Sequence, residues 1–146
     1  MDYGSNNKLP VMKNLVALMI ITSFVASLSC NKDGESERFK LLTGPTWGSD
    51  SLLANGVDAS GPGEMLEKFK GNAKFNTDGT GSFGTYTGTW RFAYDETQIV
   101  IETDSLPIPL TTKIAELTES SLKITTSVPN LTTGITTNIR MTFKAR

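Results

Sequence analysis

The stretch ITTNIRMTF, Ile135 to Phe143, decides the fold, because bulky apolar side chains recur in it at every second position. One set of alternate positions carries Ile, Thr, Ile, Met and Phe, and the other carries Thr, Asn, Arg and Thr. Successive side chains of a β-strand point to opposite faces, so this period of two predicts a strand with one buried face and one solvated face. A slip of one residue would expose the whole apolar row.

The same period recurs earlier in the chain, in short runs about ten residues apart, a spacing typical of antiparallel sandwiches and barrels. The further strands that we expect are Trp47–Leu53, Ala73–Phe75, Phe83–Tyr86, Trp90–Tyr94, Gln98–Thr103, Thr111–Leu117 and Leu122–Val128. Short turns favour pairing between neighbours in sequence. We therefore predict an all-β fold, a meander of about eight strands that closes into a barrel and so leaves no free edge.

Glycine, proline and aspartate mark where these elements end. Asn76–Gly79 predicts a hairpin turn, because Asp-Gly accepts the positive φ that such turns need. Gly88 predicts a second tight turn before Trp90. A short helical turn around residues 38–42 must stop at Gly44-Pro45, and the apolar spacing of Glu64–Lys70 predicts a second short helix or 3₁₀ turn.

The N-terminal region carries a different signal. Lys8 and Lys13 precede the uncharged run LVALMIITSFVASLSC, Leu15 to Cys30. Its apolar part is about 14 residues long, whereas a membrane-spanning helix needs about 20. A short apolar run between a basic segment and small residues is typical of a secretory signal. We expect residues 1–29 to be a signal peptide, residues 30–37 a flexible tether and residues 38–146 one β-barrel domain.

Cys30 is the only cysteine, so no internal disulfide can form. One interpretation is a buried thiol that packs as a small hydrophobe. The other is a thioether to a lipid, and the position of Cys30 directly after the apolar run favours it. A single acyl chain anchors a protein only marginally, and two or more anchor it stably.

Residues 27–30, Ser-Leu-Ser-Cys, resemble the lipobox of bacterial lipoproteins, and the Lys-plus-acidic stretch Cys30–Glu35 resembles the export signal of Bacteroidetes-type lipoproteins. The resemblance implies lipidation of Cys30, with palmitate as a typical acyl group. It also implies attachment to the outer membrane with the domain on the cell surface; the periplasmic face is the alternative. The alternative for Asn31–Glu35 is an ordinary polar tether.

Composition excludes several function classes. The chain has 14 basic and 15 acidic residues, a net charge of −1, and no histidine. Without a basic excess, nucleic acid is not an expected partner. Without histidine there is no ordinary catalytic triad, and the commonest metal ligand is missing. We therefore expect no catalytic residues, no bound metal and no cofactor.

Five short motifs occur in the predicted barrel in a characteristic order. They are LLTGPTW at 41–47, FNTDGT at 75–80, GTW at 88–90, IAELT at 114–118 and SLKI at 121–124. In this order and spacing the chain resembles the bacterial lipocalin-like lipoproteins. The resemblance implies a barrel that encloses a small apolar ligand, with the tryptophan of the first strand, Trp47, plugging the closed end.

Four aromatic residues are the candidate ligand contacts, since aromatic rings stack on sugar faces and mark binding surfaces when exposed: Trp47, Tyr86, Trp90 and Tyr94. The alternative is core packing, which the alternation of Trp90, Phe92 and Tyr94 on one strand face favours.

Two acidic patterns are weaker candidates for chemistry. Glu102 and Asp104, two residues apart at a strand end, could form a carboxylate pair, but no companion motif marks a cleft and a solvated strand end is the simpler interpretation. Asn76-x-Asp78-Gly79 resembles part of a calcium loop, but Thr85 stands where the acidic ligand would be, which favours a plain turn.

The predicted function is a membrane-anchored, non-enzymatic lipoprotein that binds a small apolar ligand; the alternative is a surface β-sandwich module that binds glycans or proteins.

Overall fold

The computed structural model describes residues 34–129 and 134–146, and Glu35–Arg146 form one compact unit. Cys30 and the predicted signal peptide lie outside the described residues. The helices are α2 (Glu37–Thr43) and the 3₁₀ helix η1 (Glu67–Phe69). The strands are β1 (Trp47–Ala54), β2 (Val57–Asp58), β3 (Asn72–Phe75), β4 (Thr80–Phe83), β5 (Tyr86–Ala93), β6 (Gln98–Thr103), β7 (Leu110–Leu117), β8 (Ser121–Pro129) and β9 (Thr136–Ala145).

The strands form one antiparallel sheet that closes on itself. Their order is β2-β1-β3-β4-β5-β6-β7-β8-β9, and β1 also pairs with β9, from Trp47 opposite Ala145 to Ala54 opposite Ile139. Because β2 pairs only with the last residues of β1, the other eight strands make the barrel. The predicted all-β fold, an antiparallel meander of about eight strands closed into a barrel, is confirmed. Closure protects the strand edges from further pairing.

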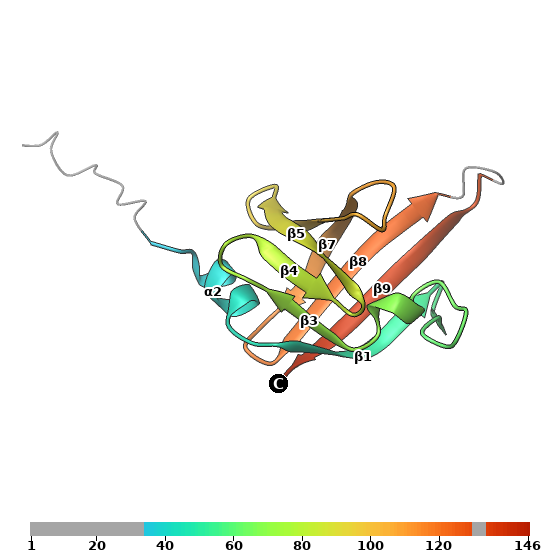
Figure 1. The fold of residues 1–146 in the computed structure, drawn as a ribbon, viewed down its shortest axis with the longest axis horizontal. Helices are drawn as coiled ribbons and strands as arrows, with labels where there is room; N and C mark the ends of the chain where they lie inside the picture. Colours follow the sequence, from blue (N-terminus) through green and yellow to red (C-terminus); the bar gives the residue numbers. More distant parts are fainter. Residues whose placement is uncertain (1–33, 130–133) are drawn as a thin grey trace, which may run out of the picture. The chain divides into compact units, whose positions relative to one another are not determined.

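The core lies between two facing walls of this barrel. Figure 1 shows β3, β4 and β5 crossing in front of β7, β8 and β9. In β9 the predicted alternation is observed, since Ile139, Met141 and Phe143 are buried while Arg140 and Lys144 are exposed. The largest fully buried apolar side chains are Trp47, Phe75, Leu42, Leu66, Ile99, Leu122, Ile124 and Met141. Their burial is the main stabilising term of the fold.

Helix α2 covers the barrel end at which β1 begins. The Ser36 hydroxyl caps it by accepting a hydrogen bond from Phe39 N at 2.9 Å, and the helix ends at Gly44 as the Gly-Pro pair predicts. Lys74 Nζ on β3 donates to three carbonyl oxygens at the C-terminal end of the helix, those of Thr43, Gly44 and Pro45. A charged donor thus satisfies carbonyls that have no partner within the helix.

Among the described residues, no helix is long and apolar enough to cross a membrane.

The loop between β2 and β3 packs against the opposite barrel end. Its backbone is fixed by a hydrogen bond from Ala59 N to Leu52 O at 2.9 Å and another from Leu66 N to Ala59 O at 2.8 Å. Ala59, Leu66 and Phe69 of this loop are buried in the core. The predicted second short helix is present as η1, and it places the ring of Phe69 4.8 Å from that of Tyr86.

The predicted turn at Gly88 is wrong. The turn lies at Gly84-Thr85, between β4 and β5, and Gly88 is an interior residue of β5. Gly84 has a φ of +64°, and a Cβ there would overlap the Lys68 carbonyl oxygen. A Cβ at Gly88 would overlap the carbonyl oxygen of Glu102 on the neighbouring strand. Glycine permits both a turn and a close backbone approach, and the sequence does not distinguish the two uses.

Two predicted alternations are one residue shorter than expected, one at the end of β5 and one at the start of β9. β5 stops at Ala93, so Tyr94 does not follow Trp90 and Phe92 into the core. Tyr94 instead opens the β5–β6 turn with a φ of 49°, and 76% of it is exposed. Similarly, Ile135 precedes β9 and is 65% exposed. Alternation defines a face only where the neighbouring strand still pairs.

Candidate functional site

The barrel interior leaves little room for a ligand. A void between the core side chains of the described residues measures about 10 Å³. Phenylalanine, alanine, isoleucine and methionine side chains line it: Phe69, Ala73, Phe75, Phe83, Ile101, Ile124, Met141 and Phe143. That volume is close to the minimum for one water molecule, whereas pockets for small ligands usually measure roughly 300–1,000 Å³.

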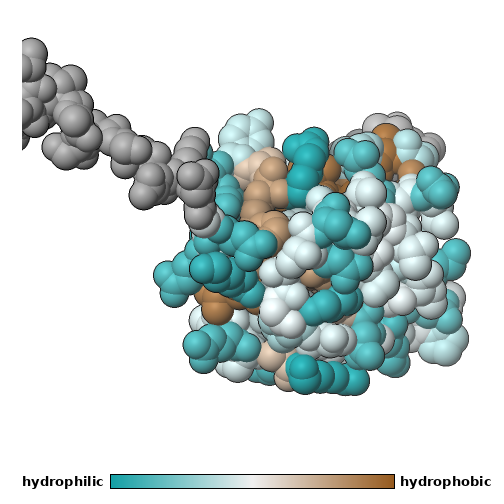
Figure 2. All heavy atoms as spheres, turned by 60° about the vertical axis from the view of Figure 1, so that its left-hand side comes forward, coloured by the Kyte–Doolittle hydropathy of each residue, from teal (hydrophilic) through white to brown (hydrophobic). Residues whose placement is uncertain are grey.

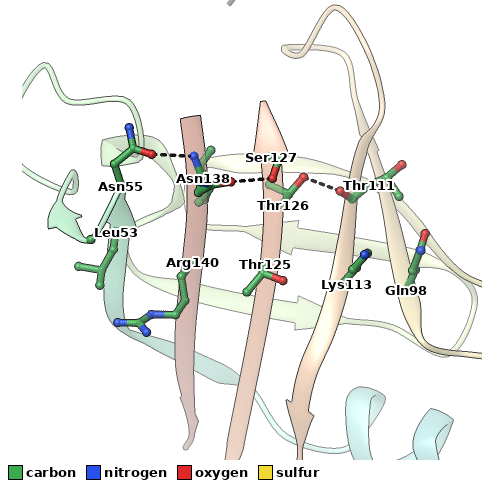
Figure 3. A pocket seen from close by; sticks show the side chains of 12 residues that line it. Leu53, Asn55, Gln98, Thr111, Lys113, Thr125, Thr126, Ser127, Asn138 and Arg140 are labelled. Carbon is green, nitrogen blue, oxygen red and sulfur yellow. Dashed lines mark hydrogen bonds between the residues drawn. The ribbon is translucent and has the colours of Figure 1, made fainter. Parts of the chain in front are cut away.

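A much larger hollow, which we call the outer groove, lies on β1, β9, β8 and β7. It measures about 800 Å³. It is lined by Leu53, Asn55, Gly56, Gln98, Thr111, Lys113, Thr125, Thr126, Ser127, Asn138, Ile139 and Arg140. Figure 3 shows their side chains spread across the sheet, with Gln98 reaching the groove from the start of β6.

Strand register brings five groove residues into one row. Leu53 pairs with Arg140, Arg140 with Thr125, Thr125 with Lys113, and Lys113 with Gln98. Each of them alternates along its strand with a buried residue of the core, such as Leu52, Met141, Ile124, Thr112 and Ile99. The row therefore lies on the outer face of the sheet, opposite the filled interior.

Hydrogen bonds hold one margin of the outer groove in place. Asn55 Oδ1 accepts from Asn138 N at 2.9 Å, and Asn138 Oδ1 accepts from the Ser127 hydroxyl at 2.9 Å (Figure 3). The Thr126 hydroxyl donates to Thr111 O at 2.7 Å. These contacts link β1, β9, β8 and β7, so the margin is ordered before any ligand binds.

The four aromatic candidates do not meet in one site. Trp47 is fully buried, and its indole Nε1 donates to Leu42 O at 2.9 Å, at the barrel end that α2 covers. Trp90 is 5% exposed and donates to Asn76 O at 3.0 Å. Tyr86 is half-buried at the opposite barrel end, and Tyr94 is exposed on a turn. A role for any of them in ligand contact stays a prediction.

Of the acidic candidates, Asp78 lies on a turn, Glu102 near the end of β6, and Asp104 directly after that strand. Asp78 Oδ1 accepts from both the hydroxyl and the backbone N of Thr80, and these bonds lower the pKa of Asp78, the hydroxyl contributing most. The Asn76–Gly79 segment is thus the predicted hairpin turn. Glu102 and Asp104 are both exposed and line a hollow of about 510 Å³ beside the β6–β7 loop. Within the described ranges, no three His, Cys, Asp or Glu side chains gather as a metal site.

Among residues 34–129 and 134–146, the exposed large apolar side chains are scattered along the chain and form no obvious docking surface. They are Val57, Met65, Tyr94, Ile108 and Ile135. On the face shown in Figure 2, hydrophobic residues form small separate patches among hydrophilic ones. Single exposed apolar residues are normal on protein surfaces, so the outer groove is the strongest candidate site.

No family model and no curated protein matches the chain. A search of solved structures finds similarity to bovine odorant binding protein, in its complex with a selenium-containing odorant. The two are 16% identical, with a TM-score of 0.44, and the match covers 79% of this chain and 76% of that one. A likeness of this extent supports no conclusion about function. The class of fold, a closed antiparallel meander barrel, follows from the strand order and closure of the chain itself.

The outer groove has no signature in the sequence. Its lining residues are threonine, serine, asparagine, glutamine, lysine and arginine at the solvated positions of strands. Such positions are polar in any half-exposed strand. Only the pairing of β1 with β9, which closes the barrel, brings Leu53 and Asn55 beside Asn138 and Arg140. The one usable signal is the absence of acidic residues among these positions.

Proposed function

We propose that the chain is a non-enzymatic lipoprotein of the outer membrane, held at the cell surface by fatty acids, palmitate among them, on Cys30. In this proposal the barrel is a binding module whose polar ligand lies in the outer groove. The support for the anchor is the apolar run that ends at the only cysteine. The support for binding in the groove is its volume. The outer groove measures about 800 Å³, whereas the void inside the barrel measures about 10 Å³.

The start of the barrel unit and the outer groove lie toward different ends of the barrel. Ser36 lies at the α2 end of the barrel, and the chain between Cys30 and Ser36 is at most about 20 Å long when extended. The groove residues of β1, β8 and β9 lie toward the opposite ends of those strands, where Ala54 pairs with Ile139. Within the Glu35–Arg146 unit, the groove thus lies away from Ser36, near which the proposed tether joins the barrel.

A small apolar ligand inside the barrel is the second candidate. The observation that favours it is the wholly apolar lining of the interior void. Phe69 of η1 forms part of that lining and belongs to the loop that packs against this barrel end. Binding of a drug-sized molecule would require this loop and the Phe69 ring to move outward, because the present void is far too small.

Metabolic labelling with palmitate tests the anchor. The wild-type chain is expected to carry the label and Cys30→Ala to lack it. Equal absence of label from both chains would contradict lipidation.

Native mass spectrometry of the chain purified from its host tests the binding site. We expect a co-purifying polar molecule that is lost from Thr125→Trp, which fills the outer groove. It should be retained by Thr87→Trp, a matched change at an exposed position of β5 outside the groove. An apolar molecule that survives Thr125→Trp would favour the second candidate instead.

A further inference from the structure

Among the described residues that line the outer groove, the charged side chains are both positive. They are Lys113 and Arg140, and no carboxylate of residues 34–129 or 134–146 lines the groove. Both are exposed, and neither makes a hydrogen bond or ion pair with any described residue. By contrast, Lys123, on the same outer face, is paired with Glu116 at 2.6 Å. The two groove cations therefore remain available to an anionic ligand.

The two cations lie on either side of Thr125. Lys113 pairs with Thr125 on β7–β8, and Thr125 pairs with Arg140 on β8–β9. They are thus two strand spacings apart, about 10 Å. A ligand that reaches both must extend across the strands, with anionic groups spaced along it. Figure 3 shows Lys113, Thr125 and Arg140 side by side on three neighbouring strands.

Several side chains in the rest of the lining have hydrogen-bond donors that no described residue uses. The side-chain NH₂ groups of Asn55 and Asn138 have no partner among the described residues, since only the oxygens of these carboxamides are used. The Gln98 and Thr125 side chains likewise make no hydrogen bond there. Donors of this kind complement hydroxyl and carboxylate oxygens. None of the described lining residues is aromatic, so they offer a neutral sugar no ring to stack on.

The backbone hydrogen bonds of the groove strands exclude one common way of binding a peptide, the addition of the peptide as an extra strand. Peptides commonly add a strand to an open sheet edge. β9 is paired on both sides, with β1 and β8, and β8 is paired with β7 and β9. The floor of the outer groove therefore offers side chains to a ligand, but no free backbone edge for an added strand.

We propose that the outer groove binds an acidic saccharide, an oligosaccharide that carries uronic acid carboxylates. Two of these carboxylates pair with Lys113 and Arg140, and the sugar hydroxyls accept hydrogen bonds from the carboxamides and Thr125. This inference rests on the proposed function, from which it takes the groove, and adds the chemical class of the ligand.

Isothermal titration calorimetry of the full chain in detergent, with tetragalacturonate as the probe, tests the inference. Tetragalacturonate is expected to bind, with an affinity that falls as salt rises. Lys113→Gln and Arg140→Gln should each weaken binding tenfold or more. The controls Lys144→Gln and Arg91→Gln, which remove the same charges from exposed positions of β9 and β5 outside the groove, should leave binding unchanged. All four positions are exposed, so circular dichroism should show the same fold for every variant.

The competing outcomes separate the two proposals. Equal binding of cellotetraose, a neutral saccharide, would overturn the acidic ligand class, yet loss of that binding in Thr125→Trp would still support the groove. Tighter binding of hexaglutamate than of tetragalacturonate would overturn a saccharide in favour of an acidic peptide. Binding of tetragalacturonate that Thr125→Trp leaves intact would overturn the groove itself, and with it the proposed function.

Discussion

The indole Nε1 of Trp47 donates a hydrogen bond of 2.9 Å to the carbonyl oxygen of Leu42, and both residues are fully buried. This bond joins the first strand to the helix that covers the barrel end. It satisfies a carbonyl from the last turn of α2, which would otherwise be buried without a partner.

Trp47→Phe keeps a ring in the core but removes the donor, so it should lower the free energy of unfolding by about 1–3 kcal/mol. Urea unfolding of the Glu35–Arg146 unit measures this. Tyr94→Phe, at an exposed turn position, is the control and should change stability by no more than about 0.5 kcal/mol. Equal stability of Trp47→Phe and the wild type would show that the bond contributes nothing.

Lys74 ties α2 to β3 through its three carbonyl acceptors at 2.7 to 3.1 Å. Lys74→Met retains the aliphatic stem and removes the charged donor, so we expect a loss of about 1.5–3 kcal/mol. Lys68→Met removes a lysine from an exposed position of η1 and should have little effect. If both variants unfold at the same urea concentration, the contact of Lys74 with the helix end is not stabilising.

Gly88→Ala should destabilise the barrel more than Gly56→Ala. A Cβ at position 88 overlaps the Glu102 carbonyl oxygen of the paired strand, and forcing β5 and β6 apart costs about 3 kcal/mol. Gly56 has a φ of +85° but nothing within 4 Å of its Cβ position, so alanine there meets only backbone strain, about 1 kcal/mol. The reverse order of thermal stabilities would contradict the strand spacing seen here.

Asp78 should contribute to the pH dependence of stability. The hydrogen bonds from Thr80 lower its pKa below the usual 3.8 in the folded state. A carboxyl whose pKa is lower when folded stabilises the fold fully above its unfolded pKa, and loses this contribution as pH falls through the folded value. Urea midpoints measured from pH 6 to pH 2 should therefore fall more steeply below about pH 4 for the wild type than for Asp78→Asn. Parallel curves would indicate that the turn does not favour the ionised carboxyl.

The strands with alternating apolar and polar residues could be predicted from sequence, because apolar side chains are buried and polar ones face solvent. Ile139, Met141 and Phe143 are buried, and Asn76–Gly79 turns as Asp-Gly requires. The error at Gly88 has a physical cause, since glycine serves both turns and close approaches. The end of β5 before Tyr94 depends on where pairing with β6 stops, which the local sequence does not encode.

The outer groove could not be predicted, because it is a property of register. Lys113 and Arg140 come together with Gln98 only once β6, β7, β8 and β9 are paired in the observed alignment. Aromatic residues were the natural candidates for binding, but the structure uses Trp47 and Trp90 to fill the core. Aromatic residues serve both in core packing and in ligand contact, so the sequence alone does not show which of the two roles a given ring has.

The central claim, that ligand binds outside the filled barrel, is tested most directly by NMR mapping of backbone amides during a titration with tetragalacturonate. We predict chemical-shift changes concentrated at Thr111–Lys113, Thr125–Ser127 and Asn138–Arg140, with Phe75 and Phe83 of the interior wall unchanged. Changes centred instead on Phe69, Phe75 and Phe83, with the outer groove unaffected, would contradict the claim.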